Sequence, residues 1–304
     1  MTTINNSIEP KLSIIIPAYK ARSTIIACLT ALMQSSAGIN TEIIVVISAN
    51  DGTEQLIAEH FPEIRRLCFS ERCYAGMARN RGAAYATGDI LFFLDADCQI
   101  VSGALQNIIT AHQSSAAAMI GGAFLNAEPS NLIGWSDYFA SLWPWLPRTD
   151  NIRCERNDLA SGCMTIKRWL FERCGGFNDE CYGEDTQLCW LLRRQGYTLL
   201  FDAGICVYHT STRSWQGLLT KRFAMGKTFA HLRIRQPDWS KHRRLGYALA
   251  SPLIPSVLLC RAALATLKAR RYFKEFILAL PLTCLILTSW SLGEAVGYWL
   301  ADDD

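Results

Sequence analysis

The chain has 304 residues, of which 50% are hydrophobic and 19% are charged, so it can bury a sizeable core in one large domain with an appendage or in two modest domains. The formal net charge is only +3, but the segment from Arg213 to Glu275 holds 14 Lys or Arg and 2 Asp or Glu, which leaves 16 basic and 25 acidic residues elsewhere. These basic residues flank long apolar runs, and this pattern favours anionic lipid over nucleic acid as the partner of the segment.

The twelve cysteines do not follow the pattern of a disulfide-rich secreted protein. They have no regular spacing, no secretory apolar region precedes them, and no C-x-x-C pair occurs, which argues against a disulfide framework and a structural zinc site. Several, such as Cys28 and Cys98, lie within apolar stretches, where cysteine acts as a small buried hydrophobe. We therefore expect reduced thiols.

The first hundred residues predict a nucleotide-binding half-sheet. After a polar start at 1–10 that we expect to be disordered, apolar runs of the kind that a parallel sheet buries on both faces alternate with stretches of helical spacing. Strands are predicted at 12–16, ended by Pro17, and at 42–47 and 90–94, with helices at 24–34 and 76–86. A strand, a helix and a strand in about forty residues form a βαβ unit.

The middle of the chain continues this alternation and adds a loop that covers the cleft. The predicted elements are a helix at 102–112, a strand at Gly121–Gly122, a Trp-rich loop at 135–145, a strand at 159–166, helices at 168–174 and 184–195, and a strand at 204–208. Glycines end both of the later helices, as is common at helix C-termini.

The last part of the chain predicts attachment to a membrane. A domain at 11–235 is followed by a basic linker at 236–244, a membrane-associated helical hairpin at 245–300 and an acidic tail at 301–304. The first apolar segment is short for a span, which needs roughly twenty residues, and the second is long enough. Basic residues flank the first segment on both sides. If this segment crossed the membrane once, one of the two basic groups would lie on the non-cytoplasmic side, against the positive-inside tendency. We expect the first segment to be re-entrant or interfacial and the second to span or pair with it; a buried hairpin of a soluble domain is the alternative.

Two carboxylates follow a buried strand at Asp95-Ala96-Asp97. Ligands of open α/β sheets collect beyond the carboxyl ends of the strands. Neighbouring carboxylates repel each other unless a cation lies between them, and Mg²⁺ or Mn²⁺ favours carboxylate oxygens shared with substrate phosphates. The pair predicts a metal site that holds a diphosphate, and acids in a turn that caps the strand are the alternative.

An ordered set of motifs joins this pair. The segments are SIIIPAY at 13–19, ARNRG at 78–82, TGD at 87–89, LDAD at 94–97, GGF at 175–177 and GED at 183–185. The set resembles family 2 glycosyltransferases of the GT-A fold, an α/β fold with a Rossmann-like nucleotide-binding sheet flanked by helices, here with a C-terminal apolar helical membrane segment. The resemblance extends over residues 12–208.

The resemblance implies a donor site at the ends of the first strands. The turn of Pro17, Ala18 and Tyr19 corresponds to the one that wraps the nucleotide base. Arg79 and Asn80 correspond to the position that reaches the nucleotide or its phosphates, where a forked guanidinium suits a diphosphate.

The resemblance also implies a metal site. Asp95 corresponds to the residue near the ribose and the metal, and Asp97 to the direct metal ligand. His209 corresponds to a histidine that can approach the metal or the diphosphate, although a histidine at a strand end also serves structural roles.

Glu184 and Asp185 open a predicted helix, where the positive end of the helix dipole stabilises a carboxylate. Capping is therefore one role for the pair. By resemblance, one of the two deprotonates the acceptor hydroxyl, with inversion at the anomeric carbon. We predict Asp185 as this base, with Glu184 as the second choice.

The chain departs from the family pattern after the second strand. Family members commonly carry an Asp there that holds the base, but no acid occupies Ile47 or Ser48. Either Asn50 or Asp51 replaces it, or the nucleotide is bound differently, so the base stays open between uridine and guanosine. Arg222 matches a Gln/Arg-rich helix of related enzymes poorly and is expected on a solvated or headgroup-facing helix.

The resulting hypothesis is an inverting glycosyltransferase of the inner (cytoplasmic) membrane, with its catalytic domain facing the cytoplasm. It moves a sugar from a nucleotide-diphosphate sugar, with Mg²⁺ or Mn²⁺, to a hydroxyl of a lipid-linked or polysaccharide acceptor. A non-catalytic membrane scaffold and an aspartate-nucleophile phosphatase are the alternatives, although such phosphatases normally have Thr or Val two residues after the second Asp, and Ile100 comes three after it. A dinucleotide-dependent oxidoreductase is disfavoured because no G-x-G-x-x-G follows the first strand.

Overall fold

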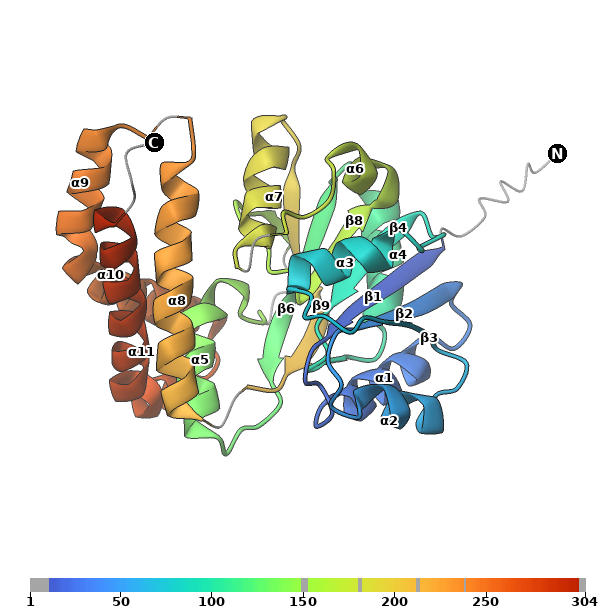
Figure 1. Cartoon of the computed structure of the whole chain (residues 1–304). Helices are drawn as coiled ribbons and strands as arrows, with labels where there is room; N and C mark the ends of the chain where they lie inside the picture. Colours follow the sequence, from blue (N-terminus) through green and yellow to red (C-terminus); the bar gives the residue numbers. More distant parts are fainter. Residues whose placement is uncertain (1–10, 149–152, 180–181, 212–213, 238, 301–304) are drawn as a thin grey trace.

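The computed structural model describes residues 11–148, 153–179, 182–211, 214–237 and 239–300. The start at 1–10 and the acidic tail at 301–304, for which the sequence made predictions, lie outside the described residues. In the described part, a mixed sheet carries helices on both faces, and a layer of long helices stands beside it (Figure 1).

One mixed sheet runs through the described residues. Its strands are β1 (Leu12–Ala18), β2 (Thr41–Ile47), β3 (Arg65–Cys68), β4 (Ile90–Leu94), β5 (Cys98–Ile100), β6 (Met119–Asn126), β7 (Arg153–Glu155), β8 (Cys163–Lys167) and β9 (Leu199–His209). Their order is β3-β2-β1-β4-β8-β6-β9-β5, and β7 pairs with β9. The first four strands are parallel and β8 is antiparallel to β4. The carboxyl ends of β1 to β4 therefore share one edge, where the sequence places the site.

The described helices include all five that are predicted before residue 200, each close to its predicted position, and several that are not predicted. They are α1 (Ile25–Ser35), α2 (Thr53–His60), α3 (Ala75–Ala83), α4 (Ala104–Ser114), α5 (Leu132–Ser141), α6 (Arg168–Arg173), α7 (Glu184–Arg194), α8 (Trp215–Ile234), α9 (Lys241–Ala250), α10 (Ile254–Ala269) and α11 (Phe273–Trp299), with single 3₁₀ turns η1 (Trp143–Trp145) and η2 (Ser251–Leu253). No run of apolar residues in the sequence predicts α2 or the short strands β3, β5 and β7.

The central strands are buried on both faces, as their continuous apolar runs predict. Ile14 and Phe92 belong to a core shared with α1 and α4. The next residues along the same strands, Ile15 and Phe93, belong to a second core shared with α6 and α7. Side chains alternate across a strand, so these two strands hold both layers of helices.

The prediction that Pro17 ends the first strand is wrong. β1 continues to Ala18, and Pro17 is in register with Val46 of β2. On the other side, pairing of β1 with β4 stops at Ile15. Pro17 therefore lies where only one neighbouring strand remains, a place where the missing N–H group is tolerated.

The predicted Trp-rich loop at 135–145 is a helix followed by a 3₁₀ turn. Trp135 is buried and its ring stacks on Phe139 with centroids 5.6 Å apart. Tyr272, which lies just before α11, approaches the Trp135 ring at 4.9 Å. The tryptophan thus packs against the C-terminal helices instead of covering the cleft.

The helices α5, α8, α9, α10 and α11 form the layer on the left of Figure 1, and we call them the helical layer. α9, η2 and α10 make one helical stretch from Lys241 to Ala269, and this stretch and α11 are each long and apolar enough to cross a membrane by length and composition. The predicted linker at 236–244 is partly helical, because α9 begins at Lys241. α8 precedes that linker but packs along α11 (Figure 1), so the division at 235 stays a proposal.

Candidate active site

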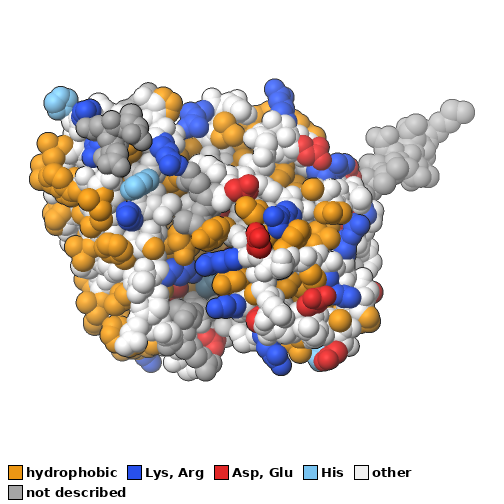
Figure 2. All heavy atoms as spheres, in the orientation of Figure 1, with side chains coloured by type: hydrophobic (Ala, Val, Ile, Leu, Met, Phe, Trp, Pro, Cys, Tyr) orange, Lys and Arg blue, Asp and Glu red, His pale blue; other side chains and the backbone are white. Residues whose placement is uncertain are grey.

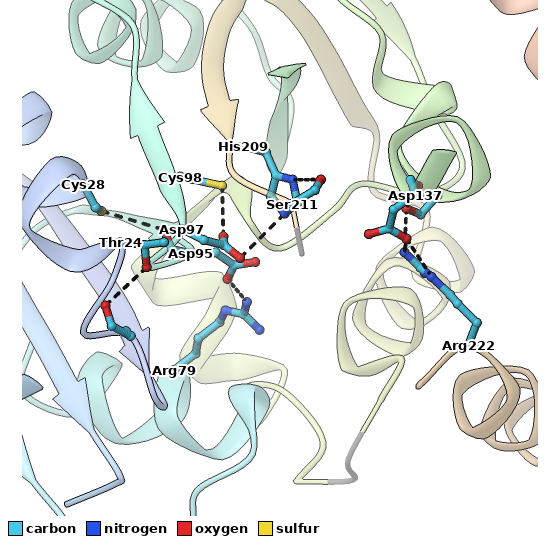
Figure 3. A network of polar contacts seen from close by, with 12 residues as sticks. Thr24, Cys28, Arg79, Asp95, Asp97, Cys98, Asp137, His209, Ser211 and Arg222 are labelled. Atoms are coloured by element: carbon cyan, nitrogen blue, oxygen red, sulfur yellow. Dashed lines mark hydrogen bonds and ion pairs between the residues drawn. The ribbon is translucent and has the colours of Figure 1, made fainter. Parts of the chain in front are cut away.

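Asp97 and His209 meet because of strand pairing. Cys98, the first residue of β5, pairs with His209 at the end of β9, and the N–H of Thr210 donates to the backbone oxygen of Asp97 at 2.9 Å. This register brings His209 Nε2 to 3.7 Å from Asp97 Oδ2. Figure 3 shows Asp97 between Asp95 and the imidazole. The predicted proximity of Asp97 and His209 is therefore present in the fold.

Arg79 connects the two predicted pairs of carboxylates. Its guanidinium is 2.5 Å from Asp95 Oδ1 and 2.7 Å from Glu184 Oε1, and its side chain is 2% exposed. Burial disfavours the charge, but Asp95 and Glu184 more than compensate and raise the pKa of Arg79 above its ordinary value. α3, β4 and α7 are thus joined at one point, because a buried guanidinium needs more than one acceptor.

The turn at Ser161 and Gly162, just before β8, makes a second connection. The N–H and hydroxyl of Ser161 donate to Asp185 Oδ2 at 3.2 and 3.3 Å. On the other side, the N–H of Asp95 points to the Gly162 carbonyl at 3.4 Å, and a Cβ on Gly162 would lie 2.8 Å from Asp95 Oδ2. Asp95 and Asp185 therefore belong to one site, on opposite sides of this turn. A strand is predicted over 159–166, but this turn lies at its middle and β8 begins only at Cys163.

Glu184 and Asp185 have different environments although they are adjacent. Glu184 is buried, and burial together with the charge of Asp185 raises its pKa to about 6, against the opposing effect of Arg79. Asp185 is half-buried and accepts the N–H of Thr186 at 2.7 Å. Glu184 is committed to Arg79, whereas Asp185 keeps an exposed part.

Asn80 is engaged within the protein. Its amide accepts the N–H of Phe177 at 2.9 Å and donates to the Phe177 carbonyl at 2.8 Å and to Asp179 at 3.1 Å. Gly176 approaches it so closely that a Cβ would be 2.6 Å from the Asn80 Oδ1 atom. These contacts fix the loop that leads into α7. Arg79 and Asn80, both predicted to bind the donor, are thus occupied by protein groups, and their contact with a donor stays a prediction.

The end of β1 carries an exposed aromatic and basic cluster. Tyr19 follows the half-buried Pro17 and the buried Ala18. The guanidinium of Arg72 lies 4.6 Å from the Tyr19 ring centre and 4.8 Å from that of Tyr74, and both tyrosines are exposed. The sequence analysis did not select Arg72 or Tyr74, although their place between β3 and α3 puts them at the same edge.

The end of β2 shows what stands in place of the missing acid. Asp51 Oδ1 accepts the N–H of Thr53 at 3.2 Å, which helps to begin α2. Asn50 lines a surface pocket of about 260 Å³ together with Arg22 and Gly52. Asp51 therefore stabilises the turn before α2, and Asn50 is the more accessible of the two predicted substitutes.

The predicted metal ligands are only partly assembled. Among the described residues, no three His, Cys, Asp or Glu side chains converge closely enough to hold a metal ion. Asp95 directs Oδ1 to Arg79, while Asp97 faces His209. Burial and the negative charge of Asp95 both raise the pKa of Asp97, whereas the positive charges of His209 and Lys221 lower it by a smaller amount. A carboxylate beside an imidazole and a second carboxylate is a donor set that suits Mn²⁺ or Mg²⁺.

Arg222, expected on a solvated helix, is instead buried. It donates to Asp137 of α5 from Nε at 3.0 Å and also from Nη2, and to Ser141 at 2.7 Å. Figure 3 shows this pair apart from the cluster around Asp95. The pair joins α8 to α5 and makes no contact with the candidate site.

Comparison with known proteins decides the family. Residues 13–175 match the model of glycosyl transferase family 2. The chain belongs to glycosyl transferase family 2. This glycosyltransferase is 25% identical over 224 residues to glycosyltransferase AglE of Haloferax volcanii, covering 72% of each chain. It is also 31% identical over 103 residues to the uncharacterized glycosyltransferase YibD of Escherichia coli, covering 33% of this chain and 30% of that one.

Solved structures agree on the fold of this family 2 glycosyltransferase. The mannosyltransferase PcManGT from Pyrobaculum calidifontis, in complex with GDP-Man and Mn²⁺, matches with a TM-score of 0.64 at 19% identity, over 97% of this chain and 88% of that one. GalNAc-T7 with UDP, GalNAc and Mn²⁺ matches with a TM-score of 0.53 at 15% identity, over 66% and 43%. The predicted GT-A fold is confirmed, and the family excludes the phosphatase alternative.

Proposed function

We propose that this glycosyltransferase transfers a sugar with inversion from a nucleotide-diphosphate donor to a hydroxyl group of a lipid-linked or polysaccharide acceptor. The observation that carries the proposal is the joining of Asp95 and Glu184 by Arg79, with Asp185 held on the far side of the Ser161–Gly162 turn. One site would thus present carboxylates on a donor side and on an acceptor side.

Asp185 is the proposed general base. Its carboxylate accepts the proton of the acceptor hydroxyl, the oxygen forms a bond to the anomeric carbon, and the bond from that carbon to the diphosphate oxygen breaks, so the nucleoside diphosphate leaves with the electron pair. Ser161 orients the base through two hydrogen bonds. Glu184 is the second candidate for the general base, because its carboxylate already accepts a hydrogen bond from Arg79.

Asp97 and His209 are the residues that would hold Mg²⁺ or Mn²⁺, with Asp95 beside them. Bound there, the metal would neutralise the diphosphate leaving group. Mn²⁺ is present in the complexes of both structural neighbours, which supports a divalent ion.

Tyr19 and Arg72 are the proposed contacts of the nucleotide base, since an exposed ring and a stacked guanidinium both offer flat faces. Pro17 and Ala18 would shape the turn below them, and Asn50 would provide the polar contact that an Asp gives elsewhere. The neighbours bind GDP-Man and UDP, so both bases belong in the test.

The setting that we propose is the cytoplasmic face of the inner membrane. The catalytic domain at 11–235 would face the cytoplasm, and 245–300 would hold it at an anionic membrane surface near a lipid-borne acceptor. The two long apolar helices support this attachment.

The test is release of nucleotide from a panel of GDP- and UDP-sugars with Mg²⁺ or Mn²⁺. We expect Asp185→Ala to lower turnover by roughly 10²–10⁴-fold, the range for a positioned acid–base group, and Asp97→Ala to lower turnover because it removes a proposed metal ligand. Glu172→Ala, on the exposed surface of α6, is the control and keeps full turnover. Unchanged turnover in Asp185→Ala would contradict its role as base, and absence of nucleotide binding by calorimetry would favour the scaffold alternative.

A further inference from the structure

At Gly226 and Gly293 the backbones of α8 and α11 approach each other so closely that no side chain fits between them. A Cβ on Gly293 would be 2.0 Å from the Phe223 carbonyl oxygen, and one on Gly226 would be 2.2 Å from the Trp290 carbonyl oxygen. Gly297 sits one turn further along α11, at the spacing that allows two helix backbones to touch. α8 and α11 must therefore move as one body.

Buried polar groups fix the same contact. Glu294 of α11 is 2% exposed. Its carboxylate accepts hydrogen bonds from Arg233 of α8 at 3.0 Å, from the indole N–H of Trp290 at 2.6 Å and from the Tyr298 hydroxyl at 3.0 Å. This face of α11 is satisfied inside the protein and is not turned toward lipid.

α8 cannot follow α11 into the hydrocarbon core of a bilayer. It carries Lys221 and Lys227, which are not buried, and charged side chains in the middle of a bilayer are costly. The N–H of Thr210 donates to the Asp97 carbonyl at 2.9 Å, and α8 begins five residues later at Trp215, so the chain enters α8 from the candidate active site. A span by α11 would pull this site into the membrane.

The opposite face of the helical layer is apolar and exposed. On α11 this face consists of Ile277, Leu278, Leu285, Leu292 and Trp299, and on α10 of Val257, Leu264 and Leu267. Hydrophobic side chains accordingly gather over the helical layer in Figure 2. We call these residues the outer apolar face.

Basic residues lie at both ends of the outer apolar face. Lys268, Arg270, Arg271 and Lys274 surround the turn between α10 and α11, and all are exposed. Lys241 and Arg243 lie at the start of α9, at the other end of the first helical stretch. If the first helical stretch crossed the membrane, one of these two basic groups would lie on the non-cytoplasmic side, against the positive-inside tendency. A helix parallel to the surface instead places both groups on anionic headgroups.

We infer that the outer apolar face docks on one leaflet of an anionic membrane, with α10 and α11 parallel to its surface, and that neither helix crosses it. This inference deepens the proposed membrane attachment and rests on it.

The experiment measures the depth of nitroxide labels in vesicles that contain phosphatidylglycerol. Cysteines replace Ile277, Leu285 and Leu292, one at a time, in the full chain. In that chain the exposed Cys68, Cys260 and Cys284 are replaced by serine, and the signal from labelling of this background protein is subtracted. We expect the three depths to agree within a few Å. A span instead places position 285 near the bilayer centre, about 12 Å deeper than position 277, at about 1.5 Å per residue. Such a gradient overturns the inference, and so do three water-exposed labels.

Charge reversal gives a second arm with a matched control. Lys274→Glu, in the first turn of α11, leaves folding intact because an acid suits a helix N-terminus, and it should weaken vesicle binding about fivefold or more. Arg173→Glu, exposed on α6, should leave binding unchanged. Equal losses in the two variants would contradict the docking face. Neither measurement uses catalysis, so failure here is distinguishable from failure of the proposed reaction.

Discussion

The edge of the sheet and the helical layer both bury an arginine against carboxylates, with different results. At the sheet edge, Arg79 is paired with Asp95, whose side chain is 37% exposed. In the helical layer, Arg222 is paired with Asp137, whose side chain is 11% exposed. A buried ion pair therefore does not mark an active site by itself. The site is distinguished by one partner of the arginine, Asp95, whose carboxylate keeps one side open to a ligand.

Removal of each arginine tests this comparison and should have the largest effect. Arg79→Met and Arg222→Met each leave a carboxylate without its partner and should lower the free energy of unfolding at pH 8 by about 3–5 kcal/mol, measured by urea denaturation. Only Arg79→Met should also weaken donor binding in calorimetry, since only Arg79 positions the crevice.

A double variant separates charge from packing in this first prediction. Glu184→Gln combined with Arg79→Met should recover part of the lost stability, because the unpaired carboxylate is gone. A loss below about 1 kcal/mol in Arg79→Met, against the larger value expected for a broken buried pair, would contradict the bridging role.

The contact between α8 and α11 gives the second prediction. Gly293→Leu forces the two backbones apart and should cost about 1–3 kcal/mol or more, the range for overpacking, measured by thermal unfolding. Gly246→Leu is the matched control, because nothing lies within 4 Å of a Cβ there, and it should be neutral or slightly stabilising. Equal stability of the two variants would mean that α8 and α11 are not in close contact.

The pH dependence of stability sharpens the comparison with a smaller effect. The pKa of Glu184 is raised from 4.5 to about 6, so the folded protein binds this proton more tightly than the unfolded chain does. The resulting stability is fully present below pH 4.5 and is lost as the pH rises through about 6, a change of about 2 kcal/mol.

The measurement for this prediction is the free energy of unfolding between pH 4 and pH 8 (about two pH units on either side of the shifted pKa). Glu184→Gln has no titrating group at this position, so its curve should fall less steeply than that of the natural chain. Parallel curves would show that Glu184 does not titrate in this range.

The sequence predicted the half-sheet well because its strands are continuous apolar runs, and a parallel strand buried on both faces needs such a run. It also predicted Asp97 and His209 as neighbours, through the family pattern. It could not predict that Arg79 holds both Asp95 and Glu184, because that contact depends on how α3 and α7 meet across 105 residues.

The Trp-rich segment shows a different kind of error. Trp135, Tyr138 and Phe139 have the i, i+3, i+4 spacing of a helix face, a signal for α5 that the prediction of a loop at 135–145 does not use. Gly293 and Gly297 also have a helix-packing spacing, but the sequence does not reveal that α8, rather than lipid or a second chain, is the partner.

The turn at Ser161 and Gly162 has a consequence for how the two halves of the reaction are kept in step. Gly162 touches Asp95, the carboxylate on the donor side, and Ser161 holds Asp185, the carboxylate on the acceptor side. The length of this two-residue turn therefore sets the distance between the two carboxylates, and both reactants must fit into that distance. Any larger residue at position 162 would increase the distance between Asp95 and Asp185. That change would affect the positions of both reactants at once.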